Sequence, residues 1–330
     1  MLACPPGEQL LEHIDSGVPV FPLLVPEGFR SFSRWGAGWT GLAGSAGECA
    51  AAVRRLRQIV TQNQVQLIHA NNLKMLLLAA AAAPEIPRIW HVRDIFPATS
   101  LNKQITNLAC RLSSRILCVS RAVAQQFATT LKVELLYNAV ELPAIDGASR
   151  CANAKITFGY AGRLDRGKGL ETLIEAFCSL KAETTRLKIV GDGPLASTFN
   201  GLESVEQVSF QKQMSTVWPE FDVVVQPSDE PDSFPRSVIE AMSFGKPVIG
   251  SRIGGIPEAI EDGVTGFTFQ PGDAGALANR IRMLLTDGEL RRSMGRAGRK
   301  RCELLFTVER QMALLAAHYR KLAPAVGRAA

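Results

Sequence analysis

The chain has 330 residues, a hydrophobic fraction of 46% and a formal net charge of +6. This length suits two domains of ordinary size, and the composition is typical of a packed globular protein, which excludes a disordered chain. The mild positive charge favours an anionic substrate. Because there is no zinc-finger spacing and no aromatic residues interleaved with basic runs, the sequence does not predict nucleic-acid binding.

Cysteines, histidines and apolar runs narrow the chemistry further. Seven cysteines are scattered without a Cys-x-x-Cys pair, which predicts reduced thiols in a cytoplasmic protein, with Cys118 and Cys178 at core positions. The four histidines are unclustered, so no metal site is predicted. The longest apolar run, 76–84, is far shorter than the about 20 residues that span a bilayer. Peripheral contact with the inner membrane face is left open.

Strands alternate with helices through the first half of the chain. Apolar runs predict strands over 17–24, 66–70, 88–92, 115–119 and 133–137. Helical spacing predicts helices over 48–62, 73–83, 102–112 and 121–129. Alternation of this kind indicates a parallel sheet covered on both faces. The Gly-, Ser- and Trp-rich segment 27–46 is predicted to be a long loop.

A small, polar linker over 142–154 is predicted before a second alternating series. Its strands are predicted over 156–161, 187–190, 208–210, 221–228, 247–250 and 266–269. Its helices are predicted over 170–181, 214–220, 274–286, 289–305 and 308–322, with a short helix inside 232–245. The fold class is therefore α/β with two doubly wound parallel-sheet domains, 1–145 and 150–307. The last helix, within 308–325, is expected to return to the first domain.

Three loops of the second half follow strands, at the edge where open parallel sheets bind ligands. The first, 162–169, combines glycines with Arg163 and Lys168, two cations that can grip a diphosphate. It lacks the Gly-Lys-Ser/Thr order of a Walker loop, and a surface turn explains it equally well. The second, 191–194 (Gly-Asp-Gly-Pro), is either a tight turn or a backbone wall against a nucleobase.

The third loop opens with Asp232 and leads to Glu240, eight residues further on. A carboxylate at the start of the loop and another on the following helix can both face the ligand crevice. Carboxylate oxygens accept hydrogen bonds from vicinal sugar hydroxyls. Glu240 can also be a charge on the helix surface, but its small apolar neighbours, Ala241 and Met242, favour an inward position.

Together these segments resemble the retaining glycosyltransferases of the GT-B fold called family 4 or group 1. The resemblance covers about residues 65–320 and is most specific in the second half, where the spacing between motifs matches. The matching segments are Gly162-Arg163-Leu164 to Phe177, Gly191-Asp192-Gly193-Pro194, and Pro227-Ser228 through Asp232, Glu240, Gly245-Lys246-Pro247 and Gly254-Gly255 to Gly266. In the first half, His91 lies where the family has a similar segment, although a single histidine after a strand is more often structural.

The resemblance implies two Rossmann-like domains that face each other across a cleft. It implies an enzyme that moves a hexose-type sugar, with retention, from a UDP- or GDP-sugar to a hydroxyl in polysaccharide or glycolipid assembly. The acceptor would be a glycan, a lipid-linked molecule or a small molecule. Arg163 and Lys168 would neutralise the diphosphate, so neither a metal nor another cofactor is expected.

The other roles that the resemblance implies concern the sugar and the nucleotide. Glu240 would hold the ribose hydroxyls, Asp232 the transferred sugar, and His91 would approach that sugar from the first domain. The catalytic set is then His91, Arg163, Lys168 and Asp232. The remaining donor-binding residues would be Gly162, Gly191, Gly193, Ser233, Phe234 and Pro235.

Three features depart from the family pattern. Asp232 stands where the family usually has Glu, and Pro235 stands where it usually has Gly, which removes one backbone N–H. The first strand, with its glycine-rich loop, is expected to be absent. Two other functions also fit the sequence: a nucleotide-sugar epimerase of the same fold, and a catalytically silent nucleotide-sugar-binding subunit.

Overall fold

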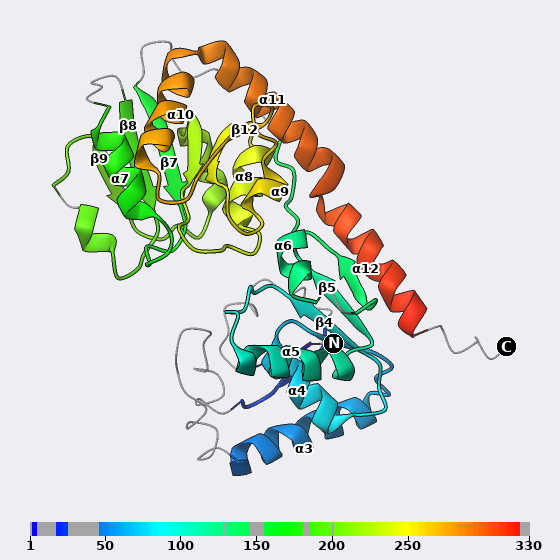
Figure 1. The fold of residues 1–330 in the computed structure, drawn as a ribbon. Coiled ribbons are helices and arrows are strands. Elements are labelled where there is room, and N and C mark those ends of the chain that lie inside the picture. The colour runs from blue at the N-terminus through cyan, green and yellow to red at the C-terminus, as the bar shows by residue number, and fades with distance from the viewer. Residues whose placement is uncertain are drawn as a thin grey trace. The chain divides into compact units, whose positions relative to one another are not determined.

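The computed structural model describes residues 2–4, 18–25, 46–127, 130–144, 155–180, 185–199 and 201–323. The chain divides into two compact units, which are described separately (Figure 1). Unit 1 comprises Met1–Cys118, Ala124–Leu135 and Ala316–Ala330, and unit 2 comprises Val119–Val123 and Leu136–Leu315. The predicted loop over 27–46, except its last residue, and most of the predicted linker over 142–154 lie outside the described residues.

Unit 1 is built on a four-stranded parallel sheet in the order β3-β4-β5-β6. Its strands are β3 (Ile68–Ala70), β4 (Arg88–Val92), β5 (Arg115–Cys118) and β6 (Val133–Leu135). Its helices are α3 (Ala46–Gln62), α4 (Leu73–Ala82) and α5 (Ser100–Leu112), with the 3₁₀ turn η2 (Gln125–Phe127). The short helix α6 (Arg121–Ala124) belongs to unit 2 except for its last residue. The side chains of Asn72 and Thr99 cap α4 and α5 by accepting hydrogen bonds from backbone N–H groups in the first turn.

A second, two-stranded sheet in unit 1 corrects the expectation that the first strand is absent. β1 (Leu2–Cys4) pairs in parallel with β2 (Val20–Pro22), and Leu2 lies opposite Val20. Because β1 has three residues, it is too short to give a periodicity signal. The segment between these strands lies outside the described residues.

Unit 2 contains a six-stranded parallel sheet in the order β12-β11-β10-β7-β8-β9. The strands are β7 (Ile156–Ala161), β8 (Thr185–Val190), β9 (Val205–Val208), β10 (Val223–Gln226), β11 (Val248–Ser251) and β12 (Gly266–Phe269). β7, the first of them in the chain, lies between β8 and β10. The chain therefore builds the sheet outward from β7 in both directions, and the carboxyl ends of β7 and β10 flank a topological switch point.

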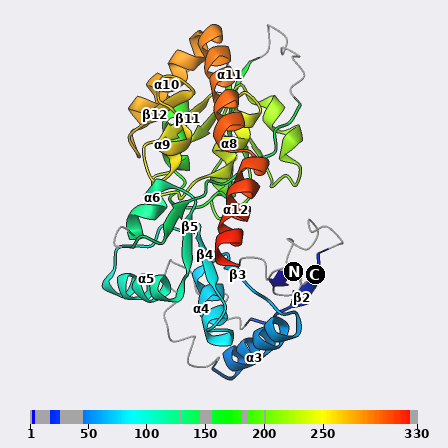
Figure 2. The same cartoon turned by 90° about the vertical axis from the view of Figure 1, so that its right-hand side faces the viewer.

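Apart from α6, the helices of unit 2 lie between its strands in the sequence and after the last of them. They are α7 (Leu170–Cys178), α8 (Arg236–Ser243), α9 (Ile256–Ala259), α10 (Ala274–Thr286), α11 (Gly288–Leu305) and the first half of α12 (Val308–Leu322), with 3₁₀ turns η3 (Ala196–Phe199), η4 (Met214–Thr216) and η5 (Trp218–Glu220). α7 packs against α10. α8 packs along α11 (Figure 2). Val223 and Val225 of β10 pack in the core with α7 and α10, whereas Val224, between them, is buried outside that cluster. Alternate side chains of β10 therefore lie on opposite faces of the sheet.

Several predicted elements differ in detail. The helix expected over 214–220 is the pair of 3₁₀ turns η4 and η5, and α9 was not predicted. Cys118 is buried as expected, but Cys178 is exposed, because it is the last residue of α7 and the chain turns away there. The last helix, α12, is divided between the units: it belongs to unit 2 up to Leu315 and to unit 1 from Ala316 onward.

Candidate functional site

Backbone hydrogen bonds join the three predicted ligand loops of unit 2 into one surface. The N–H of Leu164, in the loop after β7, donates to the carbonyl oxygen of Asp192, in the loop after β8, at 2.9 Å. On the other side, the N–H groups of Asp229 and Glu230, after β10, both donate to the carbonyl oxygen of Gly167 at 3.1 Å. The loops that the sequence places at the switch point are therefore in direct contact.

Glycine is required where these loops approach each other most closely. Gly191 has φ +145°, and a Cβ added there would lie 1.9 Å from the carbonyl oxygen of Gly162. Gly193 has φ +156°, and its Cβ would lie 2.2 Å from the carbonyl oxygen of Leu164. Both positions thus need a residue without a side chain. The structure gives the Gly-Asp-Gly-Pro segment this packing role, and its prediction as a nucleobase wall stays a prediction.

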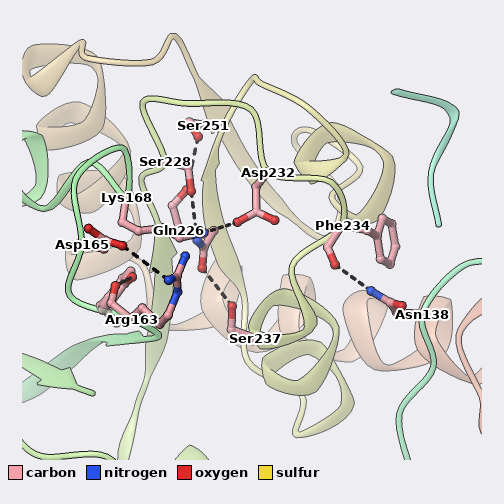
Figure 3. Close-up of polar contacts among 11 residues, drawn as sticks. Asn138, Arg163, Asp165, Lys168, Gln226, Ser228, Asp232, Phe234, Ser237 and Ser251 are labelled. Atoms are coloured by element: carbon pink, nitrogen blue, oxygen red, sulfur yellow. Dashed lines mark hydrogen bonds and ion pairs between the residues drawn. The ribbon is translucent and has the colours of Figure 1, made fainter. Parts of the chain in front are cut away.

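An ion pair at the switch point links the first and third loops. Nζ of Lys168 lies 2.6 Å from Oδ2 of Asp232, and the two side chains are 22% and 14% exposed (Figure 3). Arg163, from the same loop as Lys168, lies 3.4 Å from Asp165, and its side chain is 68% exposed. Lys168 is therefore fixed between two loops, whereas the Arg163 guanidinium reaches into solvent.

The third loop is anchored by its backbone and by Phe234. The ring of Phe234 is 2% exposed and packs against Tyr137 and Phe306, with ring centroids 5.0 and 5.4 Å away. The amide of Asn138 donates to the carbonyl oxygen of Phe234 at 2.9 Å (Figure 3). Phe234, predicted as a donor-binding residue, therefore has its side chain in the core, and any ligand contact would come from its backbone.

Pro235 precedes the helix that follows, and Glu240 lies within it. Pro235 is the N-cap residue of α8 and makes no side-chain cap hydrogen bond. Glu240 lies one turn into α8, where it forms an i,i+4 ion pair with Arg236 at 3.2 Å. The Glu240 side chain is 25% exposed. Glu240 is thus ion-paired and mostly buried, and its role as the carboxylate that holds the ribose hydroxyls stays a prediction.

A buried polar network below the ion pair was missed by the sequence analysis. Gln226 ends the apolar strand β10, is 3% exposed, and donates from Nε2 to Oγ of Ser228 at 3.1 Å (Figure 3). The hydroxyl of Ser237, on α8, donates to Oε1 of Gln226 at 2.9 Å. The network ties α8 to the end of β10 and so fixes the third loop. A polar residue closing an apolar strand was the available signal.

Tyr160, in β7, was also missed. Its hydroxyl donates to the carbonyl oxygen of Arg163 at 2.8 Å, which holds the first loop against the strand end. Burial, followed by the charge of Asp232, raises the pKa of Tyr160. The phenol therefore keeps its proton at neutral pH and remains a hydrogen-bond donor.

His91 is the one predicted site residue in unit 1; the others lie in unit 2. It stands near the carboxyl end of β4 and is 3% exposed. Nδ1 of His91 lies 3.2 Å from Nε2 of His69, and Nδ1 of His69 lies 2.7 Å from the Tyr319 hydroxyl. His69 and Tyr319 were not singled out from the sequence, although His69 and His91 occupy corresponding places near the ends of neighbouring parallel strands.

Two further observations concern metals and membranes. Within the ranges that the structure describes, no three His, Cys, Asp or Glu side chains cluster in a way that could hold a metal ion. The expectation that the donor site needs no metal stays a prediction. In the same ranges, none of the helices combines the length and the apolar character that crossing a membrane requires.

The family follows from comparison with known proteins. A family model described as "Glycosyl transferases group 1" matches residues 144–301, and one described as "Glycosyltransferase Family 4" matches residues 27–142. The chain belongs to the family 4, or group 1, glycosyltransferases of the GT-B fold. The predicted fold class is thereby confirmed.

Individual relatives are similar over part of their length. Sulfoquinovosyl transferase SQD2 of Arabidopsis thaliana is 37% identical over 152 residues, which are 44% of this chain and 29% of that protein. N-acetyl-alpha-D-glucosaminyl L-malate synthase of Bacillus anthracis is 34% identical over 141 residues, 40% of this chain and 37% of that protein. The matches thus span well under half of these curated relatives. Among solved structures, HepE of Anabaena in complex with UDP has 26% sequence identity to this chain. The two structures match with a TM-score of 0.74, and the match covers 84% of each chain.

Proposed function

We propose that this chain is a retaining glycosyltransferase that moves a hexose-type sugar from a nucleotide-diphosphate sugar to a hydroxyl acceptor in polysaccharide or glycolipid assembly. The observation that carries the proposal is the Lys168–Asp232 ion pair at the switch point, where open α/β sheets bind phosphate-containing ligands. Similarity to HepE, which has been crystallised with UDP, supports a nucleotide donor. Similarity to SQD2, a sulfoquinovosyl transferase by name, supports sugar transfer.

In this proposal, the two cations of the first loop bind the donor diphosphate. Lys168 and the solvent-reaching Arg163 balance its charge and stabilise it as the leaving group. The backbone N–H groups of Ser233 and Phe234 add donors, whereas Pro235 has none. Asp232 accepts hydrogen bonds from the transferred sugar, and Glu240 accepts them from the ribose hydroxyls.

The reaction then needs no enzymic general base. The bond between the anomeric carbon and the donor phosphate oxygen breaks, and the acceptor oxygen bonds to that carbon on the same face. The acceptor proton passes to the departing phosphate oxygen. The protein contributes positioning and charge stabilisation, and two cations take the part that a metal ion plays elsewhere. His91 contributes a contact with the sugar.

Calorimetry with UDP and turnover with a panel of UDP- and GDP-sugars test this function. The double variant R163A/K168A should bind UDP at least about 100-fold more weakly, because hydrogen bonds to charged groups contribute about 1.5–3 kcal/mol each. Arg296→Ala is the matched control: this arginine is also ion-paired and exposed, but it lies on α11 beside Glu289. Tight UDP binding by the double variant would overturn the diphosphate assignment. Binding without turnover of any donor would overturn the transferase.

A further inference from the structure

Three side chains form a hydrogen-bonded line across unit 1. The Tyr319 hydroxyl lies 2.7 Å from Nδ1 of His69, and Nε2 of His69 lies 3.2 Å from Nδ1 of His91. In the register of β3 and β4, His69 pairs with Ile89, two residues before His91, so both imidazoles lie on one face of the sheet. Tyr319 comes from the part of α12 that belongs to unit 1. The line thus joins the last helix to the predicted sugar-contacting histidine.

Both imidazoles in this line are neutral at physiological pH. Burial, with a smaller contribution from the Arg93 charge, lowers the pKa of His69 to about 4. Burial, then Arg93 and His69, lowers the pKa of His91 to about 3. A neutral imidazole has one N–H and one lone pair, so the hydrogen bond at one nitrogen decides what the other nitrogen offers.

The phenol sets the direction of the line. A phenol is a stronger hydrogen-bond donor than acceptor, so the short contact favours donation from Tyr319 to Nδ1 of His69. His69 then carries its proton on Nε2 and donates it to Nδ1 of His91. His91 must in turn carry its proton on Nε2.

Nε2 of His91 is the end of the line. This atom is buried and has no hydrogen-bond partner among the residues that the structure describes. A buried N–H without a partner is costly, and native proteins rarely keep one without a reason. A substrate oxygen would supply the missing acceptor.

We propose that Tyr319 and His69 are positioning residues that hold His91 in the Nε2–H tautomer, so that His91 offers a hydrogen-bond donor to an oxygen of the bound substrate. The identity of that substrate, a nucleotide-sugar, rests on the proposed function above. The tautomer itself does not, because it follows from contacts inside unit 1. If the hydrogen bonds run in the opposite direction, the Tyr319 oxygen accepts from Nδ1 of His69, and Nε2 of His91 has a lone pair. His91 would then bind a hydrogen-bond donor of the substrate instead of an acceptor.

Nitrogen NMR of protein labelled with ¹⁵N-histidine decides between the two directions. The chain has four histidines, so the His91 signals can be assigned by their loss in His91→Gln. The wild-type protein should show the His91 proton on Nε2. A proton on Nδ1 of His91 would overturn the proposal.

Tyr319→Phe then tests whether the hydroxyl sets the tautomer. The variant keeps the ring that stands edge-on to His69, with centroids 5.8 Å apart, and removes only the hydroxyl. The two His91 nitrogen shifts should move toward each other as both tautomers become populated. Unchanged His91 shifts would overturn the proposal. Tyr137→Phe, which removes a hydroxyl bonded to Glu258 in unit 2, is the matched control and should leave His91 unchanged.

Turnover provides a second readout that separates this inference from the proposed function. With an active nucleotide-sugar, Tyr319→Phe should lower kcat about threefold to tenfold at nearly constant donor KM, the usual effect of one misdirected hydrogen bond. A wild-type chain without turnover would reject the transferase but leave the NMR result to decide the tautomer. An active wild type with His91 protonated on Nδ1 would reject only the positioning role.

Discussion

Acidification from pH 7 to pH 5 is expected to destabilise unit 1 through His69 and His91. Burial and the nearby Arg93 charge lower their folded pKa values to about 4 and about 3, whereas the ordinary value is 6.5. Between the folded and ordinary values, the unfolded chain binds protons that the folded chain does not. The free energy of unfolding is therefore undiminished above pH 6.5 and falls as the pH drops below it.

The expected loss at pH 5 is large. At this pH the ordinary pKa lies about 1.5 units above the pH, and both folded values lie below it. One pKa unit corresponds to about 1.4 kcal/mol, so each histidine should lower the free energy of unfolding by about 2 kcal/mol, and the pair by about 4 kcal/mol. Whole domains are stable by only about 5–15 kcal/mol.

Urea unfolding followed by circular dichroism at pH 7 and pH 5 measures this loss. The wild-type protein should lose about 4 kcal/mol between the two pH values, and His91→Gln should lose about half as much. Because the wild type and His91→Gln have the same carboxylates, the difference between their pH dependences removes the contribution of carboxylate titration. Equal stability of the wild type at the two pH values, or the same pH dependence in His91→Gln, would refute the reasoning.

Two substitutions probe the predicted ligand loops of unit 2, and a third serves as a control. Gly191→Ala should lower the free energy of unfolding by about 3 kcal/mol or more, because φ is +145° and the new Cβ would meet the carbonyl oxygen of Gly162 at 1.9 Å. Gly272→Ala is the control, because φ is +76° there but no atom lies within 4 Å of the added Cβ. It should lower the free energy of unfolding by only about 1–2 kcal/mol. Equal losses of stability for the two variants in thermal unfolding would contradict this account. Pro235→Gly restores a backbone N–H before α8 and should tighten UDP binding about threefold to tenfold by calorimetry. Unchanged or weaker binding would show that this N–H does not reach the phosphates.

The arrangement of the three predicted ligand loops could be predicted from the sequence because it depends on sheet topology. Strands alternating with helices predict a parallel sheet, and loops that follow such strands gather at one edge. That reasoning brought Lys168 and Asp232 to the same place, where the structure shows an ion pair. Buried apolar strands such as β7 and β12 were also predicted with their observed bounds, since a glycine marks one end of each run: Gly162 follows β7, and Gly266 begins β12.

The features that escaped prediction depend on contacts distant in sequence. His69 and Tyr319 are 250 residues apart, so no local pattern relates them. Phe234 was expected at the ligand, but its ring fills a gap between Tyr137 and Phe306, which only the packed structure defines. β1 depends for its existence on pairing with β2, since an isolated three-residue segment has no strand preference of its own to detect.

The Lys168–Asp232 ion pair also determines what a binding measurement on this protein reports. A phosphate that takes the Lys168 ammonium has to displace a carboxylate already 2.6 Å away and tethered to the same fold. The measured affinity is then the difference between two ion pairs and understates the strength of either one. A ligand that gives Asp232 a new partner, such as a sugar hydroxyl, offsets that loss. In the proposed function, competition of this kind would make the complete nucleotide-sugar a better ligand than the sum of its phosphate and sugar parts.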